Sequence, residues 1–285
     1  MASVTGRIKE IKQPRGGYVK ASSMHVENLN DGLTPNEKEN LPGNIVGLVV
    51  DYMTRFILSN DAEKAFFNSL LGAGIADEFG KKGSLNEGIT FFKLIKGIDD
   101  ESIINACKLV KYDAWLRNKI YMAVMYKLRG QNDNTDDVPD KATIENIRLF
   151  INRSLCFFEK YGPIVREHLT FEPPNSTKEM YKKWSETKDY AFGGYTHLVD
   201  SGDGDFITSD TLWDFKVLRS NPNSKHTMQI LMYWIMGKHS RQECYKNINK
   251  IGIFNPRLNK VYTFDVNDLP YKTIDIIEKD VFNYY

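Results

Sequence analysis

The sequence predicts an α/β or α+β protein in which a helical region precedes a β-sheet. Apolar residues recur at helical spacing through much of residues 45–162. After residue 163, β-branched and aromatic residues instead gather in short segments bounded by turn formers. The predicted order is helices, three strands, a helix, two strands and a final helix.

Residues 1–44 are polar and rich in turn formers, and their first twenty residues contain five cations against one acid, Glu10. These cations are Arg7, Lys9, Lys12, Arg15 and Lys20. We expect a basic N-terminal arm that lies on the surface, with contact to a phosphate backbone as the alternative interpretation.

The helical region, 45–162, begins with the largely apolar segment 44–59, which predicts a buried first core helix. Asn60 and Asp61 are capping residues for the next helix, and residues 99–130 predict a long amphipathic helix that starts at acidic caps. Residues 129–140 predict a linker, since all but one are polar, Gly or Pro. A further helix is expected up to Gly162.

The third part, residues 163–285, predicts the sheet that would form the core of the protein. Strand patterns are found at 163–172, 195–208 and 211–218, and a helix is expected at 224–238. Residues 250–266 predict a hairpin that turns at 255–259, and the last helix is expected from about Pro270 to Tyr285.

The bulk composition limits the partners and the compartment. With 38 basic and 37 acidic residues the net charge is +1, so any contact with nucleic acid must come from local patches. Three dispersed cysteines indicate neither a disulfide framework nor a zinc or iron–sulfur site. The sequence contains no apolar segment long enough for a signal peptide or a membrane span, so we expect a soluble, cytoplasmic protein without a membrane partner.

The segment GDGDFITSDTLWDFKV (202–217) concentrates carboxylates on a predicted hairpin. A turn at Ser209–Asp210 would place Phe206 opposite Trp213 on one face and Asp205 opposite Asp214 on the other. Alternation then adds Asp203 and Lys216 to the carboxylate face. For Asp203 and Asp210 we favour a simple turn role, and a surface ion pair is the alternative for Asp214 and Lys216.

Opposed carboxylates repel one another unless a cation compensates them. Mg²⁺ or Mn²⁺ would do so, since a hard cation accepts one or two carboxylates together with water and phosphate oxygens. Such a metal ion would activate a water molecule, and Lys216 would stabilise the hydroxide or the charge that develops on phosphorus.

The helix at 224–238 places Gln229 and Tyr233 four residues apart on one face. This helix is apolar almost all round, and a buried Gln needs hydrogen-bond partners, so both polar groups are expected to point at the same site. His226, at the start of the helix, is expected to be solvated, with contact to substrate as the alternative.

The chain resembles the PD-(D/E)xK nuclease superfamily, and within it the RecB-like exonuclease branch. The residues that carry the resemblance are Asp205, Asp214-Phe215-Lys216, Gln229 and Tyr233. The resemblance covers about residues 163–266 and implies a restriction-endonuclease-like mixed sheet flanked by helices, with a large helical N-terminal or inserted region. It implies metal ligation by Asp205, Asp214 and the carbonyl of Phe215. It also implies a catalytic role for Lys216, and an orienting role for Gln229 and Tyr233.

The family also carries an acidic residue on an upstream helix, often within a G-x-x-H-x-x-x-E pattern. In residues 47–56, Asp51 and Arg55 have the four-residue spacing of the histidine and the glutamate, one residue further from Gly47 than in the pattern. Asp51 is therefore our candidate for a further metal ligand, and a salt-bridged helix residue is the alternative.

The resemblance implies a Mg²⁺- or Mn²⁺-dependent nuclease that acts on DNA. One alternative is a nuclease-fold protein that binds nucleic acid or a protein partner without cutting. Another is a metal-binding protein that acts on a phosphorylated small molecule. The sequence does not distinguish DNA from RNA, or exonuclease from endonuclease action.

Overall fold

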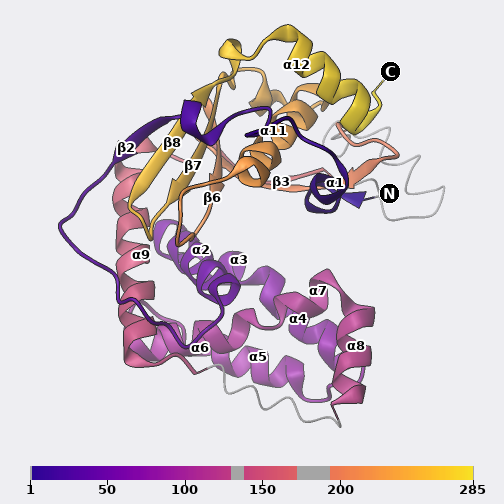
Figure 1. Ribbon diagram of the computed structural model, residues 1–285. Helices are drawn as coiled ribbons and strands as arrows, with labels where there is room; N and C mark the ends of the chain where they lie inside the picture. Colours follow the sequence, from indigo (N-terminus) through magenta and orange to yellow (C-terminus); the bar gives the residue numbers. More distant parts are fainter. Residues whose placement is uncertain (1, 130–137, 172–192, 285) are drawn as a thin grey trace. The chain divides into compact units, whose positions relative to one another are not determined.

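The computed structural model describes residues 2–129, 138–171 and 193–284 (Figure 1). The chain divides into two compact units. The sheet unit comprises Met1–Asp31 and Phe157–Tyr285, and the helical unit comprises Gly32–Cys156. The expected boundaries after residues 44 and 162 differ from these, because the first 31 residues and the last turn of a long helix pack with the sheet.

The sheet unit contains a six-stranded sheet in the order β2-β8-β7-β6-β5-β3 (Figure 1). The strands are β2 (His25–Asn28), β3 (Arg166–Thr170), β5 (Asp203–Ile207), β6 (Thr211–Phe215), β7 (Lys250–Asn255) and β8 (Lys260–Asp265). Only β6 and β7 run parallel among these neighbours, so the sheet is mixed. Helices flank this sheet, as an α+β arrangement predicts.

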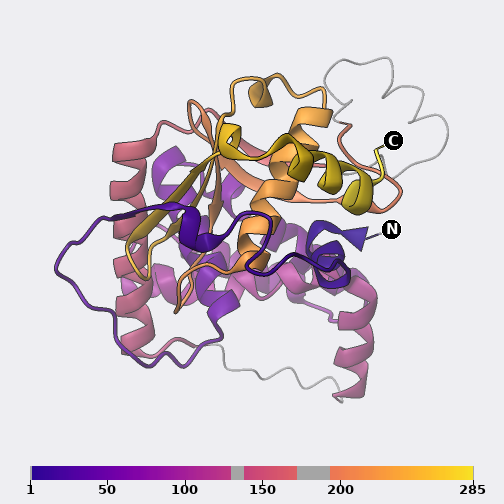
Figure 2. The same cartoon turned by 45° about the horizontal axis from the view of Figure 1, so that its top comes forward.

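Helix α11 (Ser224–His239) makes the connection between the parallel strands β6 and β7. Parallel neighbours need such a crossover, because a tight turn can join only antiparallel strands. The helix is buried almost continuously from Thr227 to Gly237 and packs on β5, β6 and β7 (Figure 2). The predicted helix at 224–238 and the predicted hairpin at 250–266 are both confirmed.

The opposite face of the sheet carries a cluster of aromatic side chains. Phe157, from the last turn of α9 (Lys141–Tyr161), stacks on Phe254 with ring centroids 4.2 Å apart and meets Trp213 edge-on at 4.9 Å. Gly252 lies beside Trp213 in the ladder, and a Cβ there would approach the indole ring to 2.3 Å. A glycine is therefore required for the indole to lie flat on β7.

The helical unit is built from consecutive helices. They are α2 (Gly43–Ser59), α3 (Ala62–Ala65), α4 (Phe67–Glu78), α5 (Ser84–Lys93), α6 (Asp100–Val110), α7 (Asp113–Arg117), α8 (Lys119–Leu128) and α9 up to residue 156. The long helix expected at 99–130 is thus broken into three. Asn118 ends α7, and its side chain accepts a hydrogen bond from the N–H of Tyr121 and so caps α8.

A buried carboxylate connects three of these helices. Asp113 in α7 accepts hydrogen bonds of 2.5 Å from the hydroxyls of Tyr52 in α2 and Ser69 in α4. Burial raises the pKa of Asp113 above its usual range, although both hydrogen bonds oppose the rise. Asp61 and Asp99 act as the expected N-caps of α3 and α6.

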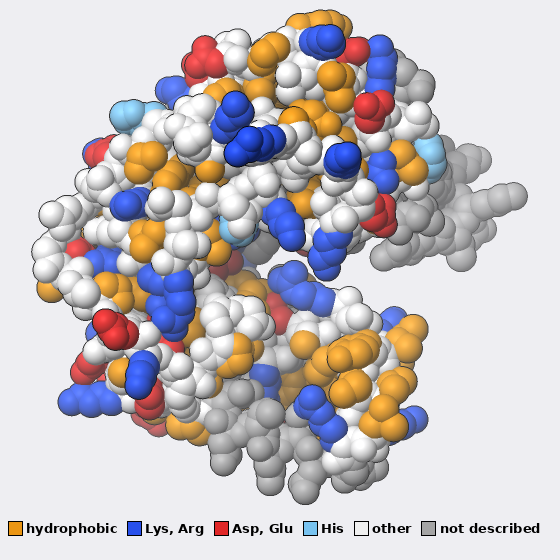
Figure 3. Space-filling model, viewed as in Figure 1, with side chains coloured by type: hydrophobic (Ala, Val, Ile, Leu, Met, Phe, Trp, Pro, Cys, Tyr) orange, Lys and Arg blue, Asp and Glu red, His pale blue; other side chains and the backbone are white. Residues whose placement is uncertain are grey.

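Helix α8 is apolar but lies at the surface of its unit. Every one of its residues is half-buried or exposed, and apolar side chains gather over it in Figure 3. Its most exposed apolar residues are Ile120, Tyr121, Val124 and Leu128. No helix within the described ranges combines the length and the apolarity needed to cross a membrane. Residues 130–137 of the predicted linker lie outside the described residues.

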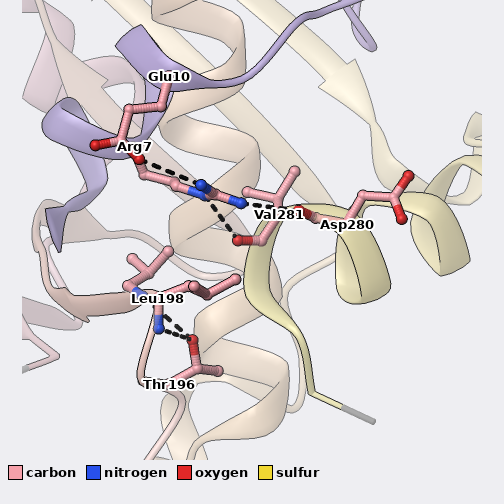
Figure 4. A network of polar contacts seen from close by, with 7 residues as sticks. Arg7, Glu10, Thr196, Leu198, Asp280 and Val281 are labelled. Atoms are coloured by element: carbon pink, nitrogen blue, oxygen red, sulfur yellow. Dashed lines mark hydrogen bonds and ion pairs between the residues drawn. The ribbon is translucent and has the colours of Figure 1, made fainter. Parts of the chain in front are cut away.

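The N-terminal segment, expected to be a surface arm, is part of the sheet unit. Helix α1 (Val4–Glu10) buries Val4 and Ile8 in the core, and β1 (Ala2–Ser3) pairs with β4 (Val199–Ser201) in a separate two-stranded sheet. Arg7 donates hydrogen bonds to the carbonyls of Asp280 (2.9 Å) and Val281 (3.0 Å), at the end of the C-terminal helix (Figure 4). That helix consists of α12 (Tyr271–Ile276) and the π-helical η4 (Ile277–Phe282).

Candidate metal-binding site

The carboxylate hairpin pairs in the register that the sequence predicts. Phe206 lies opposite Trp213 and Ile207 opposite Leu212. Phe206 and Trp213 belong to the aromatic cluster, whereas Ile207 and Leu212 belong to the core cluster that contains the apolar residues of α11. Alternation therefore places the carboxylates of β5 and β6 on the α11 side of the sheet.

Asp205 and Asp214 are held in different ways. The ladder between the described strands β5 and β6 contains two residue pairs, and neither pair joins these two aspartates. Instead the backbone N–H of Phe215 donates to Asp205 Oδ2 at 2.6 Å. A charge-assisted bond of this kind stabilises the ionised carboxylate. The ladder thus ends before Asp205 and Asp214, and a side chain–backbone bond joins Asp205 to β6.

Asp214 is a buried carboxylate with one cationic partner. Its side chain is 2% exposed, and Lys216 Nζ lies 2.7 Å from its Oδ1. The other oxygen, Oδ2, is buried and has no hydrogen-bond partner among the described residues. A surface ion pair, the alternative interpretation, is wrong for this aspartate.

Asp210 is the turn residue that the sequence predicts. Its Oδ2 lies 3.0 Å from Lys250 Nζ, in a pair whose side chains are 36% and 44% exposed. The Asp210–Lys250 pair is therefore similar in length to the Asp214–Lys216 pair but lies at the surface, whereas Asp214 is buried. Asp203, at the start of β5, is exposed.

Gln229 and Tyr233 face the carboxylates from α11. Gln229 Nε2 donates to the Tyr233 hydroxyl at 3.0 Å. The Tyr233 ring lies so close to the backbone of Gly202 that a Cβ there would meet it at 2.9 Å. Burial raises the pKa of Tyr233 far above 10.0, and nearby negative charges raise it further. These charges are those of Asp214, Asp205 and Asp203.

The residues present fit a cation that keeps much of its water shell. The buried Oδ2 of Asp214 has no hydrogen-bond partner among the described residues, and the hairpin also contains Asp205, which is bonded to the N–H of Phe215. No cluster of three or more His, Cys, Asp or Glu side chains suited to a metal ion occurs in the described ranges. This donor set matches Mg²⁺, which uses one or two carboxylates and water, and not a full protein cage.

Asp51 is the one predicted ligand outside the sheet unit. It lies in α2 of the helical unit, where Arg55 Nε donates to its Oδ1 at 2.7 Å. Asp51 and Arg55 therefore pair with each other, which is the salt-bridged alternative named above. A role for Asp51 as a metal ligand stays a prediction.

Two features near the site carry no clear signal in the sequence. His226 is half-buried, and its ring takes part in the capping box of α11. The N-terminal segment reaches the same helix start, since Thr227 Oγ1 donates to the Val19 carbonyl at 2.6 Å. A Cβ on Gly17 would meet Ser224 at 2.8 Å. Contacts across some 200 residues of chain cannot be predicted from local patterns.

Comparisons of the chain with protein-family models, curated proteins and solved structures found no match. The structure places six of the predicted site residues in one unit. They are Asp205 on β5, Asp214 and Phe215 on β6, Lys216 directly after β6, and Gln229 and Tyr233 on α11. What this site does must therefore be inferred from its own geometry and from the motif resemblance.

Proposed function

We propose that this protein is a Mg²⁺- or Mn²⁺-dependent nuclease of the PD-(D/E)xK type that hydrolyses phosphodiester bonds in DNA. The observation that carries the proposal is Asp214, whose buried Oδ2 lacks a partner while Lys216 holds Oδ1. An unpartnered buried carboxylate oxygen is costly, so its retention indicates a function. A cytoplasmic location is part of the same proposal.

The side chains divide the chemistry among them. A bound divalent cation would supply a water of lowered pKa and would polarise a phosphoryl oxygen. Asp214, Asp205 and the Phe215 carbonyl would hold that cation. Lys216 is 22% exposed, with its Nζ at the buried carboxylate, and would stabilise negative charge that develops on phosphorus. The neutral Tyr233 phenol and Gln229 would orient the strand.

The choice of nucleic acid as substrate rests on cations in the same unit. Arg15 and Lys20 are exposed on the N-terminal segment that crosses α11 in Figures 1 and 2. The contacts of Gly17 and Val19 bring this segment to the start of α11, near the site. Cations beside a metal site are suited to holding the phosphates that flank the scissile bond.

Cleavage of labelled DNA tests the proposal. Single-stranded, double-stranded and circular DNA and a matched RNA are incubated with Mg²⁺, Mn²⁺ or EDTA. We expect the wild type to cut at least one DNA only when metal is present, and Asp214→Asn and Lys216→Ala to lose at least a hundredfold in rate. Cleavage of the circular DNA would identify endonuclease action.

Lys250→Ala is the matched control, because it removes the surface member of the other Asp–Lys pair and should cut at the wild-type rate. Equal activity of Lys216→Ala and Lys250→Ala would contradict the assignment of the site. Mg²⁺ should also stabilise the wild type against unfolding, by about 2.7 kcal/mol at a hundredfold excess over Kd, and should not stabilise Asp214→Asn.

One observation favours a second function. Lys216 already neutralises Asp214, and Arg55 already neutralises Asp51, so both carboxylates are compensated without a metal ion. A nuclease-fold protein that binds nucleic acid or a protein partner without cutting would have these features. In that case Asp214→Asn would retain wild-type affinity for DNA in a gel-shift assay, and no metal would promote cleavage.

A further inference from the structure

His226 extends the polar row of α11. It precedes Gln229 by three residues and Tyr233 by seven, so the three side chains share one helix face. His226 is half-buried, and the charges of Lys216 and Asp214 both act on it. Helix α11 packs on β6, on the side of the sheet that carries Asp214, so its start lies on the same side as the Lys216–Asp214 pair.

The capping hydrogen bond determines which ring nitrogen of His226 carries the proton. The backbone N–H of Asn223 donates to His226 Nδ1 at 3.1 Å. Because Nδ1 accepts, the neutral ring must carry its hydrogen on Nε2. Burial lowers the pKa of His226, and the positive charges of Lys216 and Lys225 lower it further against the opposing charge of Asp214. The capping bond requires an unprotonated Nδ1, so the ring that makes it is neutral and can donate only from Nε2.

We propose that His226 is a further substrate-binding residue, whose Nε2–H donates a hydrogen bond to a phosphate oxygen of the bound strand. This inference rests on the proposed function and adds to it a phosphate contact at the start of α11. A fixed donor suits this position, since a hydrogen bond to an ionised phosphate oxygen is stronger than one between two neutral groups. His226 then binds this phosphate, and Lys216 acts at the scissile phosphate.

The competing interpretation is that His226 serves only as the cap of α11. Three variants separate the two roles. His226→Leu removes both the capping acceptor and the donor. His226→Gln retains both, because its carbonyl can accept from the Asn223 N–H while its amide donates. Asn223→Ala removes the other half of the capping box and leaves the imidazole in place.

The measurement is kcat and KM for the labelled DNA that the wild type cuts, with urea unfolding of each variant in parallel. We expect His226→Leu to raise KM about ten- to a hundredfold, the loss of one hydrogen bond to a charged group, with a smaller change in kcat. His226→Gln should stay within about threefold of the wild type. Asn223→Ala should lose stability but keep its KM.

An unchanged KM in His226→Leu would overturn the inference, and so would an equal rise in Asn223→Ala, since the cap would then explain the effect. Either result leaves the nuclease proposal intact, because the wild type still cuts. A wild type that cuts no DNA with any metal would instead refute the proposed function, and this phosphate contact with it.

Discussion

Lys216→Met tests whether Asp214 is a buried anion that depends on one cation. Methionine keeps most of the apolar stem of lysine and lacks the Nζ that lies 2.7 Å from Asp214 Oδ1. The carboxylate, 2% exposed, would lose its charged partner. Removing one partner of a buried pair costs about 3–5 kcal/mol. Because Lys216 is 22% exposed, water replaces part of the lost interaction, and we expect unfolding to be easier by about 2–4 kcal/mol.

The matched control is Lys250→Met, at the exposed pair with Asp210. These side chains are 44% and 36% exposed, and a surface pair of this kind contributes about 0–1 kcal/mol. Free energies of unfolding are measured by urea denaturation followed by tryptophan fluorescence. The two variants differ in burial of the carboxylate and not in the type of bond, so their difference measures the effect of burial.

A double variant completes the test. In Lys216→Met/Asp214→Asn the buried group is neutral. The loss in free energy of unfolding of this double variant should therefore be clearly smaller than the sum of the losses of the two single variants. If Lys216→Met lost no more stability than Lys250→Met, Asp214 would not depend on its lysine. Strict additivity in the double variant would lead to the same conclusion, and the electrostatic basis of the site would be refuted.

Three further predictions concern the surroundings of the site and the helical unit. Phe157→Ala removes the ring that stacks on Phe254 and should cost about 3–5 kcal/mol in urea unfolding; a cost below 1 kcal/mol would contradict the packing. Gly202→Ala would push a methyl group into the Tyr233 ring, and we expect cleavage assays to show about a ten- to hundredfold loss in kcat/KM with the fold retained by circular dichroism. Burial raises the pKa of Asp113 above 3.8, so the native state retains this proton to higher pH than the unfolded chain, and stability falls as pH rises from 3.8 to the native pKa. The free energy of unfolding of Asp113→Asn should therefore rise relative to that of the wild type between pH 4 and pH 7. If the difference between the two proteins did not change with pH, the carboxyl would be ionised throughout this range.

The pairing of the carboxylate hairpin could be read from the sequence because it is local. Strand alternation over sixteen residues separates Phe206 and Trp213 from the aspartates, and the structure has that register. Helical spacing likewise predicts that Gln229 and Tyr233, four residues apart, share one face of α11, and there they form a hydrogen bond. The order of strands and helices in the second half of the chain was likewise predictable, except that the single strand expected at 195–208 is two strands, β4 and β5.

Contacts between segments that are distant in the chain could not be predicted from local sequence patterns. The N-terminal segment was predicted to be a surface arm. In the structure, however, β2 pairs with β8, and Val4 and Ile8 are buried in the core. A short apolar pattern cannot show which partner will bury it, because that depends on surfaces formed more than 200 residues away. The break of the predicted long helix at Asn118 also follows from packing and capping that periodicity alone does not reveal.

The sequence by itself determined the residue types of the site, their faces and their order along the chain, since strand and helix periods are properties of the local backbone. Only the tertiary structure decided that Asp214 is buried with one unpartnered oxygen, while Asp205 is held by the N–H of Phe215. It also decided that His226 is half-buried and accepts a hydrogen bond from the backbone N–H of Asn223. Burial and partner choice depend on how sheet, helix and N-terminal segment pack together, and the long-range contacts that set this packing leave no periodic pattern in the sequence.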